Sequence, residues 1–206
     1  MLASRLVSEH DGPRPGRKRS EDSRLAILAA AAELVGEVGY GALTIEGIAQ
    51  RAGTGKQTIY RWWPSKADVV MEALATKADL QIPVPDSGNL EADLRAGLRS
   101  SFALARKPEV TGLLRALMAQ SQMDPGFAER FRAEFLHRRR RALRAVLERG
   151  AARGELPAGV PVETLVDVVL GTLWYRVMAI PAPLDDTLAD ELVTLICGRT
   201  EESDRA

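Results

Sequence analysis

The sequence has little of the residue types on which several classes of protein depend. Its 206 residues include one cysteine, Cys197, and two histidines, His10 and His137. A single cysteine excludes an intramolecular disulfide framework and fits a reducing cytoplasm. Two histidines far apart in the sequence supply no metal-ligand spacing. The sequence therefore predicts no metal site and no cofactor.

Leader sequences, uncharged spans and phosphate-binding loops are also missing. No basic and apolar leader begins the chain and no long span lacks charge, so we expect neither secretion nor membrane insertion. The chain has no Gly-rich phosphate loop and no histidine beside a nucleophile motif. These absences argue against an enzyme and favour a cytoplasmic protein without catalytic activity.

Helical periodicity is what the sequence does contain. Few segments suggest strands, so we expect an all-α fold of about nine helices, and 46% hydrophobic residues can bury a sizeable core. The net charge of zero is divided unevenly. Residues 1–66 carry 10 Lys and Arg against 7 Asp and Glu, and the remainder carries 18 against 21. The sign of this asymmetry favours contact between the first part and a polyanion.

Two short helices joined by a tight turn are predicted between Thr44 and Lys66. Thr44 can cap the first helix, whose apolar residues recur at the i, i+3, i+4 and i+7 positions of one buried face. Gly53 supplies a turn residue that tolerates a left-handed backbone. The second helix can start at Thr54 or Gly55, and either residue can be its N-cap. This pattern indicates a helix-turn-helix.

The second of these helices is rich in hydrogen-bond donors. Ile59 can face the first helix, and the exposed sides then carry Lys56, Gln57, Thr58, Tyr60 and Arg61. Such a surface suits the major groove of DNA, where lysine can donate to guanine and glutamine can pair with adenine. Lys66 lies in the first turn of the next helix, where a bound phosphate would favour a cation; a merely solvated lysine is the alternative.

The segment before the first long helix lacks periodicity. Residues 1–19 place glycine and proline among basic residues, which predicts a flexible arm. Ser20 then opens the first helix, which Gly39 can end. The arm either tracks a minor groove or phosphates, or is a solvated tail; its basic residues next to the helix are Arg14, Arg17, Lys18 and Arg19.

Residues 20–75 resemble the DNA-binding domain of the tetracycline-repressor (TetR) family of bacterial transcriptional regulators. The resemblance is carried by RLAILAAAAELVGEVGY, ALTIEGIAQRAG and TIYRWWPSKADVV, which keep the order and spacing of the family's motifs. It implies base contacts from Lys56, Gln57 and Thr58, and phosphate contacts from Thr44, Tyr60, Trp62 and Lys66. The chain departs from the family at Gly55, where many members carry a serine cap. We assign residues 20–66 to this domain.

A second helical domain is expected over residues 67–200, followed by a disordered tail at 201–206. Helical patterns resume after a Pro-rich break at 82–88, and Asp124-Pro125 begins a long helix that reaches about Arg153. His137 and the four arginines after it lie in the middle of that helix. Successive helical residues point in different directions, so we interpret the arginines as a solvated or salt-bridged collar rather than a second DNA contact.

The helix expected over residues 163–180 is apolar nearly all round, which is typical of a helix buried from more than one side. If its own core covers one face, the other face needs a partner. We expect a homodimer in which the last two helices pair with those of a second subunit, as the TetR resemblance also implies. The expected interface residues are Leu165, Val169, Leu173, Leu192 and Ile196.

The TetR resemblance further implies a small-molecule pocket among the C-terminal helices, whose occupancy releases DNA. Aromatic and methionine residues at helical spacing are the candidates, although such stripes are usually plain core. The candidate lining residues are Phe102, Leu117, Met118, Ser121, Phe131, Phe135, Trp174 and Met178. Their character predicts an apolar effector.

Together these features predict a sequence-specific DNA-binding regulator of transcription. Its partners would be a palindromic operator in double-stranded DNA, a second copy of itself and an apolar effector that releases a repressor. An architectural or activating DNA-binding protein without an effector is the alternative. An enzyme with a helical pocket has little support from the sequence.

Overall fold

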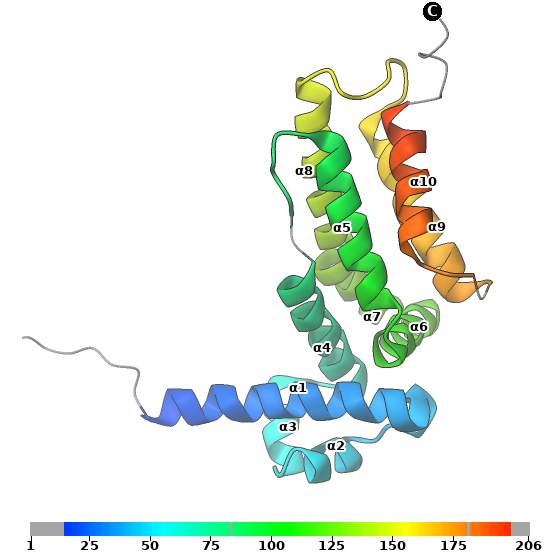
Figure 1. Cartoon of the computed structure of the whole chain (residues 1–206). Coiled ribbons are helices and arrows are strands. Elements are labelled where there is room, and N and C mark those ends of the chain that lie inside the picture. The colour runs from blue at the N-terminus through cyan, green and yellow to red at the C-terminus, as the bar shows by residue number, and fades with distance from the viewer. Residues whose placement is uncertain (1–14, 83, 181, 199–206) are drawn as a thin grey trace, which may run out of the picture.

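The computed structural model describes residues 15–82, 84–180 and 182–198, which form helices and loops with no strand among them (Figure 1). The π-helical turn η1 joins α7 to α8 without a break, so these three elements are one continuous helix. In chain order the elements are α1 (Pro15–Ala42), α2 (Ile45–Arg51), α3 (Lys56–Trp62), α4 (Lys66–Gln81), α5 (Leu90–Ala105), α6 (Pro108–Met123), α7 (Pro125–Phe131), η1 (Arg132–Leu136), α8 (His137–Ala152), α9 (Val162–Met178) and α10 (Asp186–Cys197). The all-α prediction is confirmed.

The first helix begins earlier than predicted. Helix α1 starts at Pro15, so residues 15–19 are helical and do not belong to a flexible arm. A proline suits the first helical position because its φ is already helical and its missing N–H would have no partner there. Arg17, Lys18 and Arg19 therefore lie in the first turns of α1. Arg14, like the rest of 1–14 and the predicted tail at 201–206, lies outside the described residues.

Helix α1 is the platform on which the N-terminal helices are assembled. Its buried side, which includes Ile27, Ala31 and Val35, packs against α2, α4 and α6. The helical backbone breaks at Gly39, with φ 75° and ψ 163°, as the sequence predicted. The segment Ser20–Ala42 is long and apolar enough to cross a membrane by length and composition alone. Because part of it is buried against three other helices, we interpret it as a core helix of this protein.

The C-terminal helices stand on this base as a bundle (Figure 1). Helix α5 packs against α8 and α10, α9 packs against α8, and α6 lies between the bundle and α1. Helix α4 joins the two parts because it packs against α1, α5 and α6. The largest buried side chains include Phe102, Phe127 and Phe131, and Phe131 stacks on both Phe127 and Phe135 with ring centroids 6.1 and 5.6 Å apart.

Replacing Phe131 with alanine should destabilise the fold strongly. Its ring is fully buried, so the substitution leaves a cavity and should lower the free energy of unfolding by about 3–5 kcal/mol. Urea unfolding followed by circular dichroism measures this change. Met123→Ala is the control, since Met123 is 82% exposed and its loss should change stability by less than about 0.5 kcal/mol. Equal effects of the two substitutions would contradict the packing described here.

Candidate DNA-binding surface and effector cavity

The helix-turn-helix is built by α2 and α3. Thr44 caps α2, since its Oγ1 accepts a hydrogen bond of 3.0 Å from the Gly47 amide. Gly53, with φ 64°, forms the turn as predicted. Gly55 is the N-cap of α3 and has no side chain to cap it, so the alternative start at Thr54 is excluded. The first amides of α3 are therefore left without a side-chain acceptor.

The donor-rich face of α3 is open to solvent. Ile59 is fully buried against the domain core, whereas Lys56, Gln57, Tyr60 and Arg61 are exposed and Thr58 is half-buried. The Lys56 ammonium donates to Glu46 Oε1 of α2 at 2.8 Å. This hydrogen bond raises the pKa of Lys56 and lowers that of Glu46, so both stay charged at neutral pH. A base or phosphate that binds Lys56 must compete with this carboxylate.

The two tryptophans at the end of α3 have different environments. Trp63 is 3% exposed and donates from Nε1 to Glu72 Oε2 of α4 at 2.6 Å, while Trp62 is 38% exposed. Trp63 follows the last residue of α3 as its C-cap with an extended backbone, so the two side chains have different surroundings. Glu72 also binds the guanidinium of Arg24 on α1. The end of α3 is thereby fixed to both α1 and α4.

Lys66, at the start of α4, has a structural role that was not predicted. Its ammonium donates to the carbonyls of Tyr40 at 3.1 Å and Leu43 at 2.8 Å, and it lies 4.6 Å from the centre of the Tyr40 ring. The Tyr40 carbonyl lies in the last turn of α1 and the Leu43 carbonyl in the connection between α1 and α2. Lys66 therefore holds α4 to the start of the helix-turn-helix. A phosphate contact from the same residue remains a prediction.

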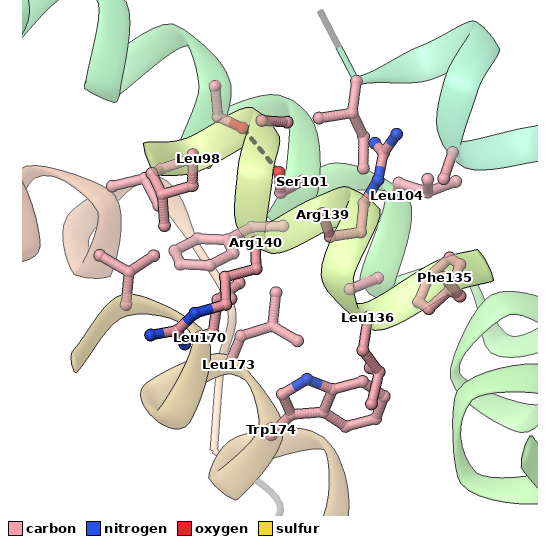
Figure 2. A pocket seen from close by; sticks show the side chains of 18 of the residues that line it. Leu98, Ser101, Leu104, Phe135, Leu136, Arg139, Arg140, Leu170, Leu173 and Trp174 are labelled. Atoms are coloured by element: carbon pink, nitrogen blue, oxygen red, sulfur yellow. Dashed lines mark hydrogen bonds between the residues drawn. The ribbon is translucent and has the colours of Figure 1, made fainter. Parts of the chain in front are cut away.

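A cavity of about 570 Å³ lies within the C-terminal bundle, bounded mainly by α4, α5, α8 and α9. Figure 2 shows its walls: Leu98, Ser101 and Leu104 come from α5, Leu170, Leu173 and Trp174 from α9, and Phe135 and Leu136 from the π-helical turn. Apolar side chains make up most of the lining. Its volume lies in the range of sites that hold small molecules.

Charged side chains also line this cavity. Arg139 donates from Nη2 to Asp79 Oδ1 of α4 at 2.8 Å, and Arg140 forms ion pairs with Glu163 and Asp167 of α9. The interpretation of the arginine run as a salt-bridged collar is thus confirmed for these two residues. Burial lowers the pKa of the Arg139 guanidinium, because a cation loses hydration there.

Family models identify both parts of this fold. The model described as bacterial regulatory proteins, tetR family, matches residues 27–73, and the tetracyclin repressor-like C-terminal domain matches residues 84–196. The chain belongs to the TetR family. It is therefore a DNA-binding transcriptional regulator and not an enzyme.

Relatives of this TetR-family regulator span nearly its whole length. The HTH-type regulator YdeS of Bacillus subtilis is 34% identical over 86% of this chain and 89% of its own. The DNA-binding transcriptional repressor TetR of Mycobacteroides abscessus is 31% identical over 85% of this chain and 92% of its own.

Solved structures that share this fold include SCO0332, FadR and AibR. The TetR-family regulator SCO0332 has a TM-score of 0.70 and 29% identity, covering 84% of this chain and 95% of its own. FadR of Bacillus subtilis in complex with stearoyl-CoA has a TM-score of 0.71 and 21% identity, covering 85% and 99%. AibR in complex with isovaleryl coenzyme A and operator DNA has a TM-score of 0.61 and 21% identity, covering 86% and 100%.

Three of the predicted pocket residues line the cavity of this TetR-family regulator, namely Phe102, Phe135 and Trp174. The other five lie elsewhere, which corrects the prediction. Leu117 and Phe131 are fully buried and belong to helices α6 and α7, which pack together. Met118 is partly buried against the core and accepts at its carbonyl from Ser121 Oγ at 2.7 Å, and Met178 is exposed.

The charged lining of the cavity was not predicted, although the sequence held a signal for it. Phe127, Phe131 and Phe135 recur every four residues, and Arg139 occupies the next position of that series. A cation that continues an apolar stripe is a candidate for a polar group in a mainly apolar site. No group of three or more His, Cys, Asp or Glu side chains arranged for a metal ion occurs in the described part of the chain.

The predicted dimer residues occupy the inner faces of α9 and α10. Leu165, Val169, Leu192 and Ile196 are buried within the single protomer, and Leu173 and Val169 line the cavity. The regular apolar stripe of each helix is thus largely covered by the protomer's own core, and a role of these five residues in a subunit interface remains a prediction. The outer faces instead expose Tyr175 at 58% and Leu195 at 66%.

Replacing Lys66 with methionine should destabilise the DNA-binding domain. The substitution removes the Lys66 donor from both carbonyls, of which that of Tyr40 keeps the Leu43 amide at 3.2 Å, and should lower the free energy of unfolding by about 1–3 kcal/mol. Urea unfolding of the purified protein measures the change. Lys77→Met is the matched control, since Lys77 lies on the same helix and bonds to no other described side chain. If both variants unfold like the parent protein, Lys66 does not hold α4 in place.

Proposed function

We propose that this TetR-family protein is a cytoplasmic repressor that binds a palindromic operator as a homodimer and is released by a small molecule. The observation that carries the proposal is that one helix, α4, belongs to both sites. Lys66 at its start bonds to the connection before the reading helices, and Leu74 and Ala78 in its second half line the cavity. A ligand that moves α4 would therefore move α3.

The comparisons support this proposal. A relative that is 31% identical is a transcriptional repressor. Two proteins of the same fold were crystallised with acyl-coenzyme A molecules, one of them also with operator DNA. For release to occur, the ligand must bind the DNA-incompetent state more tightly, since equal affinity for both states shifts nothing. The division into a DNA-binding part ending at residue 66 and an effector part of 67–200 belongs to the same proposal.

Helix α3 would read the DNA. The exposed Lys56 and Gln57 and the half-buried Thr58 near its N-terminus suit base edges, while Tyr60, Arg61, Trp62 and the exposed Thr44 suit phosphates. A two-fold dimer would place its two α3 helices about 34 Å apart, or a multiple of that distance, on one face of the duplex. The operator would then be palindromic.

Selection of bound duplexes from a random library tests this function. We expect the purified protein to enrich a palindrome at about 0.15 M salt, where non-specific binding is weak. Failure to enrich any sequence, together with no binding at low salt, would refute the proposed function.

Base contacts and phosphate contacts should differ in their mutational effects. Lys56→Ala and Gln57→Ala should each reduce discrimination between operator and random DNA by about 1–3 kcal/mol. Lys66→Met should weaken binding to all duplexes and reduce the slope of log K against log salt by about one. Fluorescence anisotropy at several salt concentrations measures both quantities. An equal loss on operator and random DNA for all three variants would contradict this division of roles.

The dimer interface would use the outer faces of α9 and α10. Tyr175 and Leu195 are large apolar side chains exposed on these two helices, and burying them against a second copy would remove apolar area from water. Leu165, Val169, Leu192 and Ile196 would support this face from within the protomer core.

A charge at Leu195 should separate the subunits. Leu195→Glu places a carboxylate in the proposed interface, and we expect monomers in sedimentation velocity at micromolar concentration and weaker operator binding. Met123→Glu is the matched control, because Met123 is an exposed apolar residue on α6, outside α9 and α10. A dimer that survives Leu195→Glu unchanged would place the interface on another face.

A further inference from the structure

Arg139 lines the cavity next to α4 and belongs to a cluster of charges with Arg138 and Asp79, neither of which lines the cavity. Asp79, near the end of α4, accepts from Arg138 Nη1 at 2.9 Å and from Arg139 Nη2 at 2.8 Å. Arg132 lies two turns before Arg139 on the same continuous helix and also lines the cavity. It has no acidic partner among the described residues. The cluster therefore holds more positive than negative charge.

The two carboxylates that line the cavity, those of Asp93 and Asp167, do not neutralise this cluster. Asp93 is buried and accepts at 2.9 Å from the Ser87 amide, with Arg149 and Arg153 nearby. Asp167 is paired with Arg140 at the α9 side of the cavity. In Figure 2, Arg139 lies on one side of the cavity, and Trp174 lies on the opposite side together with Leu170 and Leu173 of α9.

Arg139 is the member of the cluster that can reach a bound molecule. Only 18% of its side chain is exposed, against 54% for Arg138, and its chain forms part of the cavity wall. Burial lowers the pKa of its guanidinium, because the charged form loses hydration. An additional anion placed beside the guanidinium would therefore stabilise its charged form. A carboxylate suits the planar fork of a guanidinium because both oxygens can accept.

We propose that the effector of this cavity is a small molecule with an apolar body and one carboxylate. The carboxylate forms an ion pair with Arg139 and replaces Asp79 as its partner. The body would lie among the leucines, Phe102 and Trp174. Exchange of the ion pair leaves Asp79 held by Arg138 alone and so weakens the attachment of the end of α4 to α8, which links binding to the DNA-binding domain. This inference rests on the proposed function for its link to DNA, but the choice of ligand rests on the cavity alone.

Calorimetric titration with matched ligands tests the proposal. The probes are decanoate with 1-decanol and 2-naphthoate with 2-naphthalenemethanol, each pair differing only in its polar group and used below micelle-forming concentration. We expect at least one acid to bind about tenfold more tightly than its alcohol, as one charge-assisted contact provides. Equal affinities within both pairs, or no binding of any probe, would overturn the proposal.

Variants of the arginines identify the contact. Arg139→Gln should reduce acid binding to the level of the alcohol and leave alcohol binding unchanged, while Arg139→Lys should retain part of the preference. Arg132→Gln should reduce it less. Arg141→Gln is the matched control, because Arg141 is exposed on the same helix and does not line the cavity. A preference for the acid that survives Arg139→Gln would refute the role of this residue.

Removal of the competing carboxylate tests the exchange itself. Asp79→Asn leaves Arg139 without its anion, so the acid should bind several-fold more tightly than to the parent protein and release operator DNA at a lower concentration. Unchanged acid affinity would overturn the exchange.

An operator that is enriched from the library while no acid is preferred would leave the proposed repressor function intact and reject this inference alone. Failure to enrich any operator would reject the function instead.

Discussion

The bonds from Lys66 to the carbonyls of Tyr40 and Leu43 fix the start of α4, and the remaining arrangement depends on that helix. These carbonyls lie where α1 ends and α2 begins, so the Lys66 ammonium joins α4 to α1 and to the helix-turn-helix formed by α2 and α3. A carbonyl near a helix end needs a donor from elsewhere in the protein when it is partly buried. Lys66 supplies it, and the position of α3 relative to the C-terminal bundle follows from the direction that α4 then takes.

Ion pairs hold α4 at three further points along its length. Asp68 pairs with Arg130 at 3.0 Å, Glu72 with Arg24, and Asp79 with Arg138 and Arg139. Asp68 is buried, whereas the pair of Arg138 with Asp79 is partly open to solvent and contributes only about 0–1 kcal/mol, so it positions the helix more than it stabilises it. Weak, replaceable contacts suit a connector whose position must change, because a ligand with a modest difference in affinity can then shift the balance between two arrangements. The π-helical turn lies between Arg130 and Arg138 and brings Phe135 to the cavity.

Much of the DNA-binding surface could be predicted, because its determinants are local. The cap at Thr44, the left-handed glycine at 53, the buried Ile59 and the exposed donors around it all follow from spacing within a few residues. The family assignment follows from the same motifs. The start of α1 was predicted five residues too late, since Pro15 was read as part of a flexible arm and not as the first residue of a helix.

The sequence by itself determined most of the helices, the exposed hydrogen-bond donors of α3 and the presence of an apolar C-terminal core. Only the tertiary structure decided which face of each apolar helix another helix covers. Leu117, Phe131, Leu192 and Ile196 have the same periodic pattern as the residues of a pocket or a subunit interface, and all four are buried in the protomer. Conversely, Arg139 looks like a surface residue in the sequence and forms part of the cavity wall, paired with Asp79 from 60 positions earlier. Periodicity fixes the direction of a side chain relative to its own helix, whereas its neighbours depend on contacts between segments distant in sequence.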